Sequence, residues 1–338
     1  MRLSLEQREL RFAEPQHTAH GVLRGRTLIE VTLTDDEGAT GRGEAAALES
    51  YDGVSTDDVM RALDAYRKVA AEPAERRRGT LLDRCRAVAD LPQALAAIDL
   101  ATWDLAGRRA GRPTCELLTD APARVVAVNA SIARDDPAAA AAAAGAAVAS
   151  GYSCVKLKVG AGRDIERVRA VRAAIGAGAS LRLDANGAWT VEEAVDRLNA
   201  MGEFALELVE EPVRGLAAMQ ELRERVAVRI AIDESAATPG ALTARVADAV
   251  CLKISRCGGI GGLLAAASLV RASGADVYLA STYDGPLGIA GALHAAAALA
   301  PLPACGLATL DLFDDEPALF PVVGGSIAVP IGPGLGVG

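Results

Sequence analysis

The region between residues 181 and 235 holds three short apolar runs that each end in a carboxylate: LRLDANG (181–187), LELVEEP (206–212) and IAIDES (230–235). The acidic residues are Asp184, Glu210 and Asp233, which are 26 and 23 positions apart (210 − 184 and 233 − 210). One strand, one helix and two loops fill such an interval, so the spacing predicts three successive strands of a βα repeat. In a parallel α/β barrel, the carboxyl ends of the strands meet at one mouth.

Three carboxylates at one barrel mouth would repel one another strongly unless a hard divalent cation held them together. Asp184, Glu210 and Asp233 are therefore candidate metal ligands. A single acid after a strand is more often the N-cap of the following helix. Three acids at this spacing, with lysines on either side, favour the metal site.

Lysines follow two further apolar runs, CVKLKVG (154–160) and CLKIS (251–255). Lys158 and Lys253 come from strands far apart around the barrel, so they form a candidate catalytic acid/base pair that addresses opposite faces of one carbon atom. Lys156 lies two residues before Lys158 and therefore on the same strand face. It would add positive charge and contact a substrate carboxylate; the alternative is a solvated lysine at the rim of the barrel.

These motifs resemble those of the enolase superfamily, specifically its muconate-lactonizing-enzyme subgroup. The K-x-K pair, D-x-N, E-E-P, D-E-S and a later K-x-S followed by glycines occur here in the family's order. The segments GRGEAA (41–46) and AIDLATWDLAGRRAGRPTCELL (97–118) resemble parts of the family's capping domain. The resemblance covers nearly the whole chain. It implies an α/β fold, namely a modified (β/α)7β TIM-like barrel with an α+β capping domain.

The resemblance also implies how the chain is divided and which cofactor it uses. We expect the capping domain over residues 1–118, the barrel with the catalytic site over 119–312, and a C-terminal tail over 313–338 that packs back on the capping domain. One Mg²⁺ per site is the implied cofactor, and Mn²⁺ is expected to substitute for it.

The family pattern distinguishes between two neighbouring glutamates. It places the ligand two residues before the proline, which selects Glu210 rather than Glu211, and neighbours on a strand point to opposite sides. Asn186 and Glu234 would then be substrate-binding residues or would orient the ligands or a lysine. Each of them could instead be a turn residue.

Composition and charge exclude several classes of partner. The chain has 338 residues, a formal net charge of −9 and 51% hydrophobic residues, which suits a large core and two domains. No basic cluster is dense enough to predict binding to nucleic acid or to an anionic membrane. The N-terminal stretch MRLSLEQREL lacks the apolar core of an export signal, and the six cysteines show no metal-binding spacing. We therefore expect a cytoplasmic protein with free thiols and, in addition, a homo-oligomer.

Periodicity predicts elements that fit two domains. Strands at 2–11 and 27–33, joined by a polar loop, and a third strand after the turn signal at 36–38 precede helices at 56–75 and 91–109. A βα rhythm begins near residue 124. Its strands are expected at 125–132, 154–158, 181–184, 206–210, 228–233, 249–253, 276–280 and 306–310, with helices between them.

The candidate site predicts Mg-dependent abstraction of a proton α to the carboxylate of a small-molecule substrate, through an enediolate intermediate. The segments HTAHGVLRGRT (17–27) and ESYDGVSTDDVM (49–60) resemble those of dipeptide epimerases, in which Arg24 would contact the substrate. Those enzymes hold the dipeptide ammonium with a D-x-D pair. Here Asp311 matches the first position, but Phe313 takes the second, and Asp314 or Asp315 could substitute for the missing acid.

Other activities stay open. STYDGPLGIAGAL (281–293) and ACGLATL (304–310) resemble o-succinylbenzoate synthases, which dehydrate a cyclohexadiene acid. Muconate-type cycloisomerisation needs one base and the same metal. A barrel that serves only as a binding scaffold is the remaining alternative, because fold does not determine function. We rank epimerisation or racemisation of a dipeptide or amino-acid derivative first.

Overall fold

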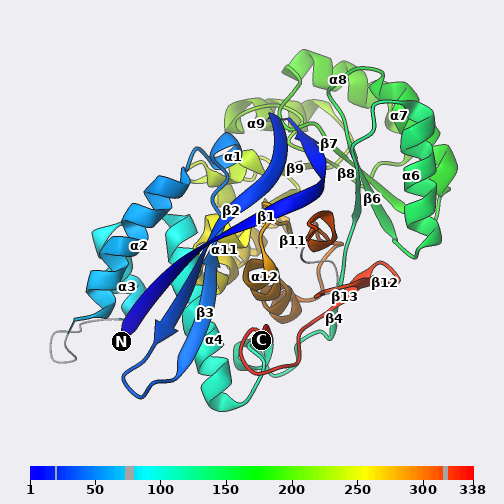
Figure 1. Ribbon diagram of the computed structural model, residues 1–338. Helices are drawn as coiled ribbons and strands as arrows, with labels where there is room; N and C mark the ends of the chain where they lie inside the picture. The colour runs from blue at the N-terminus through cyan, green and yellow to red at the C-terminus, as the bar shows by residue number, and fades with distance from the viewer. Residues whose placement is uncertain (20, 73–79, 315–318) are drawn as a thin grey trace.

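A computed structural model describes residues 1–19, 21–72, 80–314 and 319–338. It shows a mixed α/β protein in which an antiparallel N-terminal domain lies beside a curled, parallel seven-stranded sheet (Figure 1). This confirms the predicted fold class. The end of the helix expected at 56–75 and the alternative acid Asp315 lie outside the described residues.

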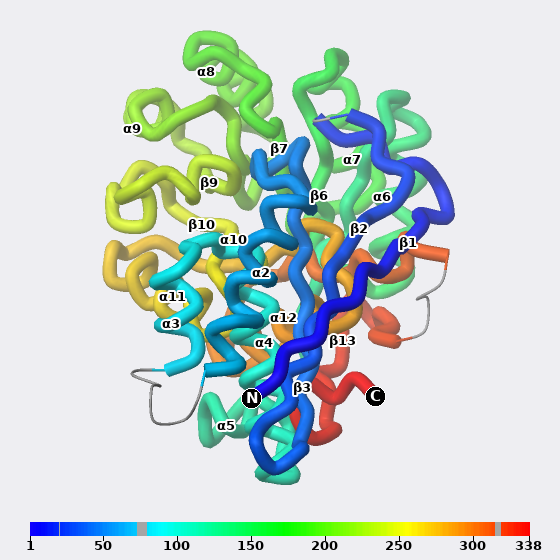
Figure 2. Tube along the Cα trace, turned by 60° about the vertical axis from the view of Figure 1, so that its left-hand side comes forward, coloured from blue at the N-terminus to red at the C-terminus, as the bar shows by residue number. Residues whose placement is uncertain are grey.

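The N-terminal sheet has the order β1-β2-β3, with β1 at Arg2–Thr18, β2 at Gly21–Thr34 and β3 at Thr40–Ala45. The prediction of a polar loop between residues 11 and 27 is wrong. Both strands continue through it as one long hairpin, with a register shift between Arg11 and Gln16. This extension projects beyond the domain core, so both of its faces carry polar residues. It therefore lacks the alternation of apolar and polar residues by which a strand is predicted. In Figures 1 and 2 the hairpin runs from the N-terminal domain towards the barrel.

Five helices follow in the described part of this domain, and the two longest pack against the sheet. Their bounds are α1 Glu49–Asp52, α2 Thr56–Ala70, α3 Leu81–Val88, α4 Pro92–Ala110 and α5 Cys115–Leu118. Ser55 and Thr80 begin α2 and α3 with capping boxes, which satisfy free amides of the first turn. Gly43 on β3 lets α4 approach closely, since a Cβ there would lie 2.0 Å from the carbonyl oxygen of Ala97.

The parallel sheet has the order β11-β10-β9-β8-β7-β6-β5. Its strands are β5 Ala130–Ile132, β6 Cys154–Lys158, β7 Ser180–Asp184, β8 Leu208–Glu210, β9 Ile230–Ile232, β10 Ala249–Leu252 and β11 Asp276–Leu279. The helices around it are α6 Pro137–Ala149, α7 Asp164–Ile175, α8 Val191–Ala200, α9 Leu216–Arg225, α10 Ile254–Cys257, α11 Ile260–Ser273 and α12 Pro286–Leu299. Strand order follows chain order throughout, as successive βα units require.

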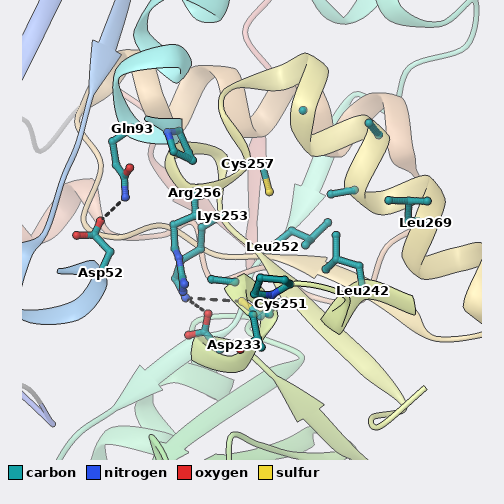
Figure 3. A pocket seen from close by; sticks show the side chains of 18 of the residues that line it. Asp52, Gln93, Asp233, Leu242, Cys251, Leu252, Lys253, Arg256, Cys257 and Leu269 are labelled. Atoms are coloured by element: carbon teal, nitrogen blue, oxygen red, sulfur yellow. Dashed lines mark hydrogen bonds and ion pairs between the residues drawn. The ribbon is translucent and has the colours of Figure 1, made fainter. Parts of the chain in front are cut away.

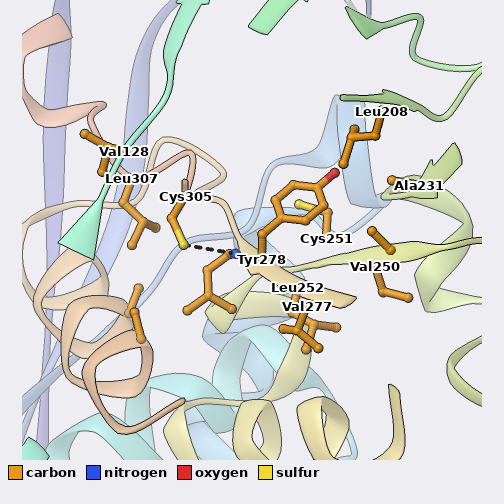
Figure 4. Packing of buried hydrophobic residues seen from close by; sticks show 14 of the residues in the cluster. Val128, Leu208, Ala231, Val250, Cys251, Leu252, Val277, Tyr278, Cys305 and Leu307 are labelled. Atoms are coloured by element: carbon orange, nitrogen blue, oxygen red, sulfur yellow. Dashed lines mark hydrogen bonds between the residues drawn. The ribbon is translucent and has the colours of Figure 1, made fainter. Parts of the chain in front are cut away.

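Isolated bridges replace the expected eighth strand. The prediction of a strand at 306–310 is wrong in its length: Cys305 pairs with Val128, Gly306 pairs with Ala280, and the chain then turns into a 3₁₀ helix at Leu310–Leu312. These two bridges join the β11 side of the sheet to the segment before β5. Figure 4 shows Val128 and Cys305 among the packed apolar side chains at this seam.

One expected helix is absent from the connection between β9 and β10. Residues 233–248 form only two 3₁₀ helices, η3 at Glu234–Ala237 and η4 at Ala241–Thr243. Pro239 has no amide hydrogen to donate, and Gly240 takes a left-handed φ of 83°. This pair of residues therefore stops a longer helix.

The tail ties both parts of the molecule together. The strand expected at 125–132 is divided, so that β4 (Val125–Ala127) pairs with β13 (Ser326–Ala328) of the tail, while β12 is Val322–Val323. Further on, the amide of Leu335 donates to Asp104 Oδ1 on α4 at 2.8 Å. The last residues therefore lie against the N-terminal domain.

Glu44 on β3 is a buried carboxyl group at the interface with the barrel. Its Oε1 accepts a hydrogen bond from the Gly285 amide, before α12, at 2.7 Å. Burial, followed by the negative charge of Asp284, raises the pKa of Glu44 to about 8, although the Gly285 amide and Arg26 act in the opposite direction and Glu30 adds to the rise. The folded state therefore holds a proton that the unfolded chain loses above its ordinary pKa of 4.5.

We expect the unfolding temperature to decline as the pH rises from about 5 to about 8, because the contribution of protonated Glu44 is present below the unfolded pKa and is lost as the pH passes the folded pKa. The variant Glu44→Gln should lose this part of the pH dependence, which corresponds to a few kcal/mol, on the order of 1.4 kcal/mol per pKa unit. Differential scanning calorimetry across this range measures it. Glu203→Gln is the matched control, since Glu203 is exposed on the barrel surface. An unchanged slope in Glu44→Gln would contradict the assignment.

Candidate active site

Neighbouring strands bring the predicted residues together at their carboxyl ends. Lys158 on β6 is the register partner of Asp184 on β7, and Asp184 is the register partner of Glu210 on β8. Asp233 follows β9, and Lys253 follows β10. The order around the mouth is thus lysine, three acids, lysine, as the strand spacing predicts.

The three acids are almost completely buried: Asp184 is 1%, Glu210 0% and Asp233 5% exposed. Oxygen atoms of Glu210 and Asp233 lie within 4.8 Å of each other and of the Cys251 sulfur. Lys156 joins the remaining acid to this group, with its Nζ 2.8 Å from Asp184 Oδ2 and 2.7 Å from Glu210 Oε1. Carboxylate oxygens are the ligands that Mg²⁺ prefers in proteins, so this donor set fits such an ion.

The proposed catalytic lysines each contact one acid. Lys158 Nζ lies 2.6 Å from Asp184 Oδ2 and 3.0 Å from Asn186 Oδ1. The Asn186 amide in turn donates to Glu234 Oε1 at 2.9 Å, so these two residues form the chain of contacts expected of orienting groups. Lys253, which is 6% exposed, pairs with Asp233 Oδ1.

The site takes three of the four lysines in the chain, and Lys68 is the fourth. Arginine supplies nearly all other positive charge. Arginine stays protonated in proteins, whereas a buried lysine can exchange its proton, so this distribution suits proton transfer at the site.

Glu211 points away from the acids. Its carboxylate accepts hydrogen bonds from the amides of Asp233 at 2.8 Å and Ser235 at 3.2 Å. It therefore braces the turn after β9, while Glu210 faces Lys156. The assignment of Glu210 rather than Glu211 as a metal ligand stays a prediction.

The charges determine the protonation of the group. Burial alone would raise the pKa of Asp184, but Lys156 and Lys158 hold it below its usual value. Burial would lower the pKa of Lys253, but Asp233 outweighs it and raises that pKa well above the ordinary range. Burial raises the pKa of Glu210, with Lys156 acting against it.

Three residues at the site were missed by the sequence analysis. The Tyr278 hydroxyl on β11 donates to Glu210 Oε2 at 2.6 Å, Cys251 lies within the acid group, and the Tyr51 hydroxyl on α1 donates to Asp233 Oδ1 at 2.8 Å. Figure 4 shows Tyr278 and Cys251 side by side inside the barrel. Strand alternation could have identified Tyr278 and Cys251 as inward-facing, but nothing in the sequence pairs Tyr51 with a barrel strand.

The structure does not bring the other two predicted substrate residues into this group. Arg24 on β2 and Asp311 on η5 are both exposed, and among the described residues neither forms a hydrogen bond or an ion pair with the acids or lysines. Phe313 is buried, its ring 4.5 Å from that of Phe12 in a stacked arrangement. It therefore packs the base of the β1–β2 extension.

A cavity of about 590 Å³ adjoins the site on the side of β9 and β10. Figure 3 shows its polar end, where Asp233 and Lys253 lie near Arg256, and where Gln93 contacts Asp52. Apolar side chains of η4 and α11, including Leu242 and Leu269, line the rest. The two 3₁₀ helices between β9 and β10 thus form part of its wall.

This combination of fold and site is that of a capped α/β-barrel enzyme with a buried group of carboxylates at the barrel mouth. Residues 3–119 match the family model for the mandelate racemase / muconate lactonizing enzyme N-terminal domain, and residues 138–338 match the enolase C-terminal domain-like model. The chain belongs to the mandelate racemase/muconate lactonizing enzyme family of the enolase superfamily.

Similar proteins in that family include dipeptide epimerases and o-succinylbenzoate synthases. An L-Ala-D/L-Glu epimerase of Clostridium acetobutylicum is 30% identical over 282 residues, which cover 80% of this chain and 78% of the epimerase. An o-succinylbenzoate synthase of Thermobifida fusca is 39% identical over 224 residues, covering 62% of this chain and 68% of the synthase. The crystal structure of a dipeptide epimerase from Enterococcus faecalis complexed with Mg and L-Leu-L-Tyr has a TM-score of 0.90 and 26% identity, covering 99% of this chain and 98% of that one.

Proposed function

We propose that this protein is a Mg²⁺-dependent isomerase that inverts the carbon α to the carboxylate of a dipeptide or an amino-acid derivative. One observation carries the proposal: two buried or half-buried lysines, Lys158 and Lys253, stand on either side of three buried carboxylates at the mouth of the barrel. In a small carboxylic acid bound between them, the two faces of the α carbon would be turned towards different lysines.

Asp184, Glu210 and Asp233 would hold the metal ion. When bound, the ion supplies positive charge beside the substrate carboxylate, which makes the α-proton acidic enough for an amine to remove. The magnesium complex of the similar dipeptide epimerase supports this assignment.

The chain's own residues then replace the α-proton by a proton from the other side. The neutral amine of one lysine accepts the α-proton, and the electron pair left on that carbon delocalises into the carboxylate as an enediolate. The ammonium of the other lysine returns a proton to the opposite face, which inverts the centre. Asn186 orients Lys158 through its Oδ1 atom, and Lys156 adds positive charge next to Asp184 and Glu210.

Phe313 bears on the substrate class. Its phenyl ring has no carboxylate to pair with a free dipeptide ammonium and packs against Phe12, so Asp311 is the remaining acid of that pair. An acylated amino group, which carries no charge, would need neither acid. N-acyl amino acids therefore stand beside dipeptides as candidate substrates, with Arg24 as a proposed contact.

o-Succinylbenzoate synthesis is the second candidate function. The similarity to the Thermobifida fusca enzyme, at 39% identity, favours it. Dehydration needs a base on one face only, so the two candidates differ in whether both lysines are required.

Incubation with Mg²⁺ in D2O tests the proposal, with a library of L,L-dipeptides and N-acyl amino acids followed by mass spectrometry. We expect a specific substrate to gain one mass unit and to form its epimer. Absence of exchange across the library, with folded and metal-loaded protein, would reject epimerisation and favour dehydration or cycloisomerisation.

A homo-oligomeric state, Mn²⁺ substitution and a cytoplasmic location remain predictions. Among the described residues, no helix is both long and apolar enough to span a bilayer.

A further inference from the structure

A side chain from the N-terminal domain reaches the acid group across the domain interface. Tyr51 lies on α1, a single turn, and is 182 positions from Asp233. Its hydroxyl is 2.8 Å from Asp233 Oδ1, the same oxygen that Lys253 contacts. One carboxylate oxygen therefore binds both a proposed catalytic lysine and a residue of the cap.

The direction of this hydrogen bond follows from the neighbours of the hydroxyl. Arg256 Nη1 lies 2.9 Å from the Tyr51 oxygen. A guanidinium group can only donate, so the tyrosine oxygen accepts from Arg256 and its own hydrogen is directed to Asp233. Arg256 thus orients the hydroxyl towards the acid.

The ring of Tyr51 contacts the same two cations. Lys253 Nζ lies 4.9 Å and Arg256 Cζ 5.0 Å from the ring centroid. Both distances are within the range of cation–π attraction. The ring therefore fixes the position of the Lys253 ammonium, while the hydroxyl fixes its carboxylate partner.

Asp52 anchors the turn that carries Tyr51. Its Oδ2 accepts from the Gln93 side chain on α4 at 2.9 Å, and its Oδ1 accepts from the Val54 amide at 3.0 Å. Gly53 ends the turn with a φ of 72°, a conformation that glycine adopts without strain. The turn is thus held on α4, in the position that places Tyr51 over the barrel mouth (Figure 3 shows Asp52 and Gln93 near Arg256).

We propose that Tyr51 is a positioning residue: its hydroxyl orients the Asp233 carboxylate and its ring orients the Lys253 ammonium. This inference rests on the proposed function, since it assumes that Asp233 binds the metal ion and that Lys253 transfers a proton.

Tyr51→Phe tests the inference, because it keeps the ring and removes only the hydroxyl. We expect Mg²⁺ to bind about 10- to 100-fold more weakly, as measured by isothermal titration calorimetry with the metal alone, which is the range for partners that orient metal ligands. With an exchanging substrate, kcat should fall more than KM rises. Tyr66→Phe is the matched control: Tyr66 is buried in the N-terminal domain, and its hydroxyl donates to Ala89 O at 2.5 Å, away from the site. It should leave Mg²⁺ affinity unchanged even if it lowers the unfolding temperature.

A second variant removes the anchor instead of the hydroxyl. Gln93→Leu should also weaken Mg²⁺ binding, but by a smaller factor. It removes the hydrogen bond that holds the turn, while the Tyr51 hydroxyl itself is kept. Wild-type Mg²⁺ affinity and kcat in folded Tyr51→Phe would overturn the inference and leave the proposed function standing. A wild-type protein that binds no divalent cation would reject both together.

Discussion

Replacement of Lys158 by alanine should lower epimerisation by about a thousand-fold, because a positioned base typically contributes 10²–10⁴-fold. Lys158 Nζ is held by Asp184 and Asn186, and the neighbouring Lys156 is itself engaged by Asp184 and Glu210. The measurement is deuterium exchange of the α-proton, with each epimer of the substrate supplied separately.

The companion variant Lys253→Ala makes this prediction specific. Each single variant should lose exchange from one face and keep some exchange from the other, so neither should form the opposite epimer. Lys68→Ala is the matched control, since Lys68 is exposed on α2 and is the one lysine outside the site. Wild-type epimerisation in Lys158→Ala would refute its role as a base, and full activity in Lys253→Ala alone would indicate a one-base reaction such as dehydration.

Replacement of Glu210 by glutamine should weaken Mg²⁺ binding by about two orders of magnitude and stop turnover. The carboxylate is fully buried, and its oxygens already face Lys156 and Tyr278, so an amide would leave the metal without one negative charge and these donors without a proper partner. Titration calorimetry with Mg²⁺ measures the first effect. An excess of EDTA should stop turnover of the wild type, and added Mg²⁺ should restore it.

Glu211→Gln is the matched control for that prediction, one residue away. Its two oxygens accept hydrogen bonds from the Asp233 and Ser235 amides and from the Ser235 hydroxyl, and it does not face the acid group. Glutamine keeps one of these acceptor atoms and leaves all three proposed ligands charged. We expect a clearly smaller change in Mg²⁺ affinity than in Glu210→Gln. The reverse order, or full activity in excess chelator, would contradict the proposed metal site.

The residues of the barrel mouth were predictable because their placement depends on local periodicity. A strand directs alternate side chains to one face, and successive βα units bring strand ends to one edge. Lys158, Asp184 and Glu210 are accordingly register partners. Interruptions of a helix were harder to predict. Pro239 and Gly240 lie in the connection between β9 and β10, which forms two 3₁₀ helices instead of one α-helix.

Pairings between segments far apart in the sequence could not be predicted from local periodicity. Cys305 and Gly306 form single bridges to Val128 and Ala280, which lie on opposite sides of the gap between β5 and β11, and the chain then turns into η5. The division of the strand at 125–132 follows from pairing with the tail, and the long β1–β2 hairpin contacts Phe313 through Phe12.

The order of motifs along the chain was thus enough to establish the family, the barrel and the set of three acids and three lysines, because each depends on spacing within a few residues or one βα unit. The hydrogen bonds that Tyr51, Arg256 and Tyr278 add around these acids could be found only in the tertiary structure. Hydrogen bonds such as that from Tyr51 to Asp233 join residues 182 positions apart. No local pattern encodes such a pair, because its geometry arises only when the N-terminal domain packs against the barrel.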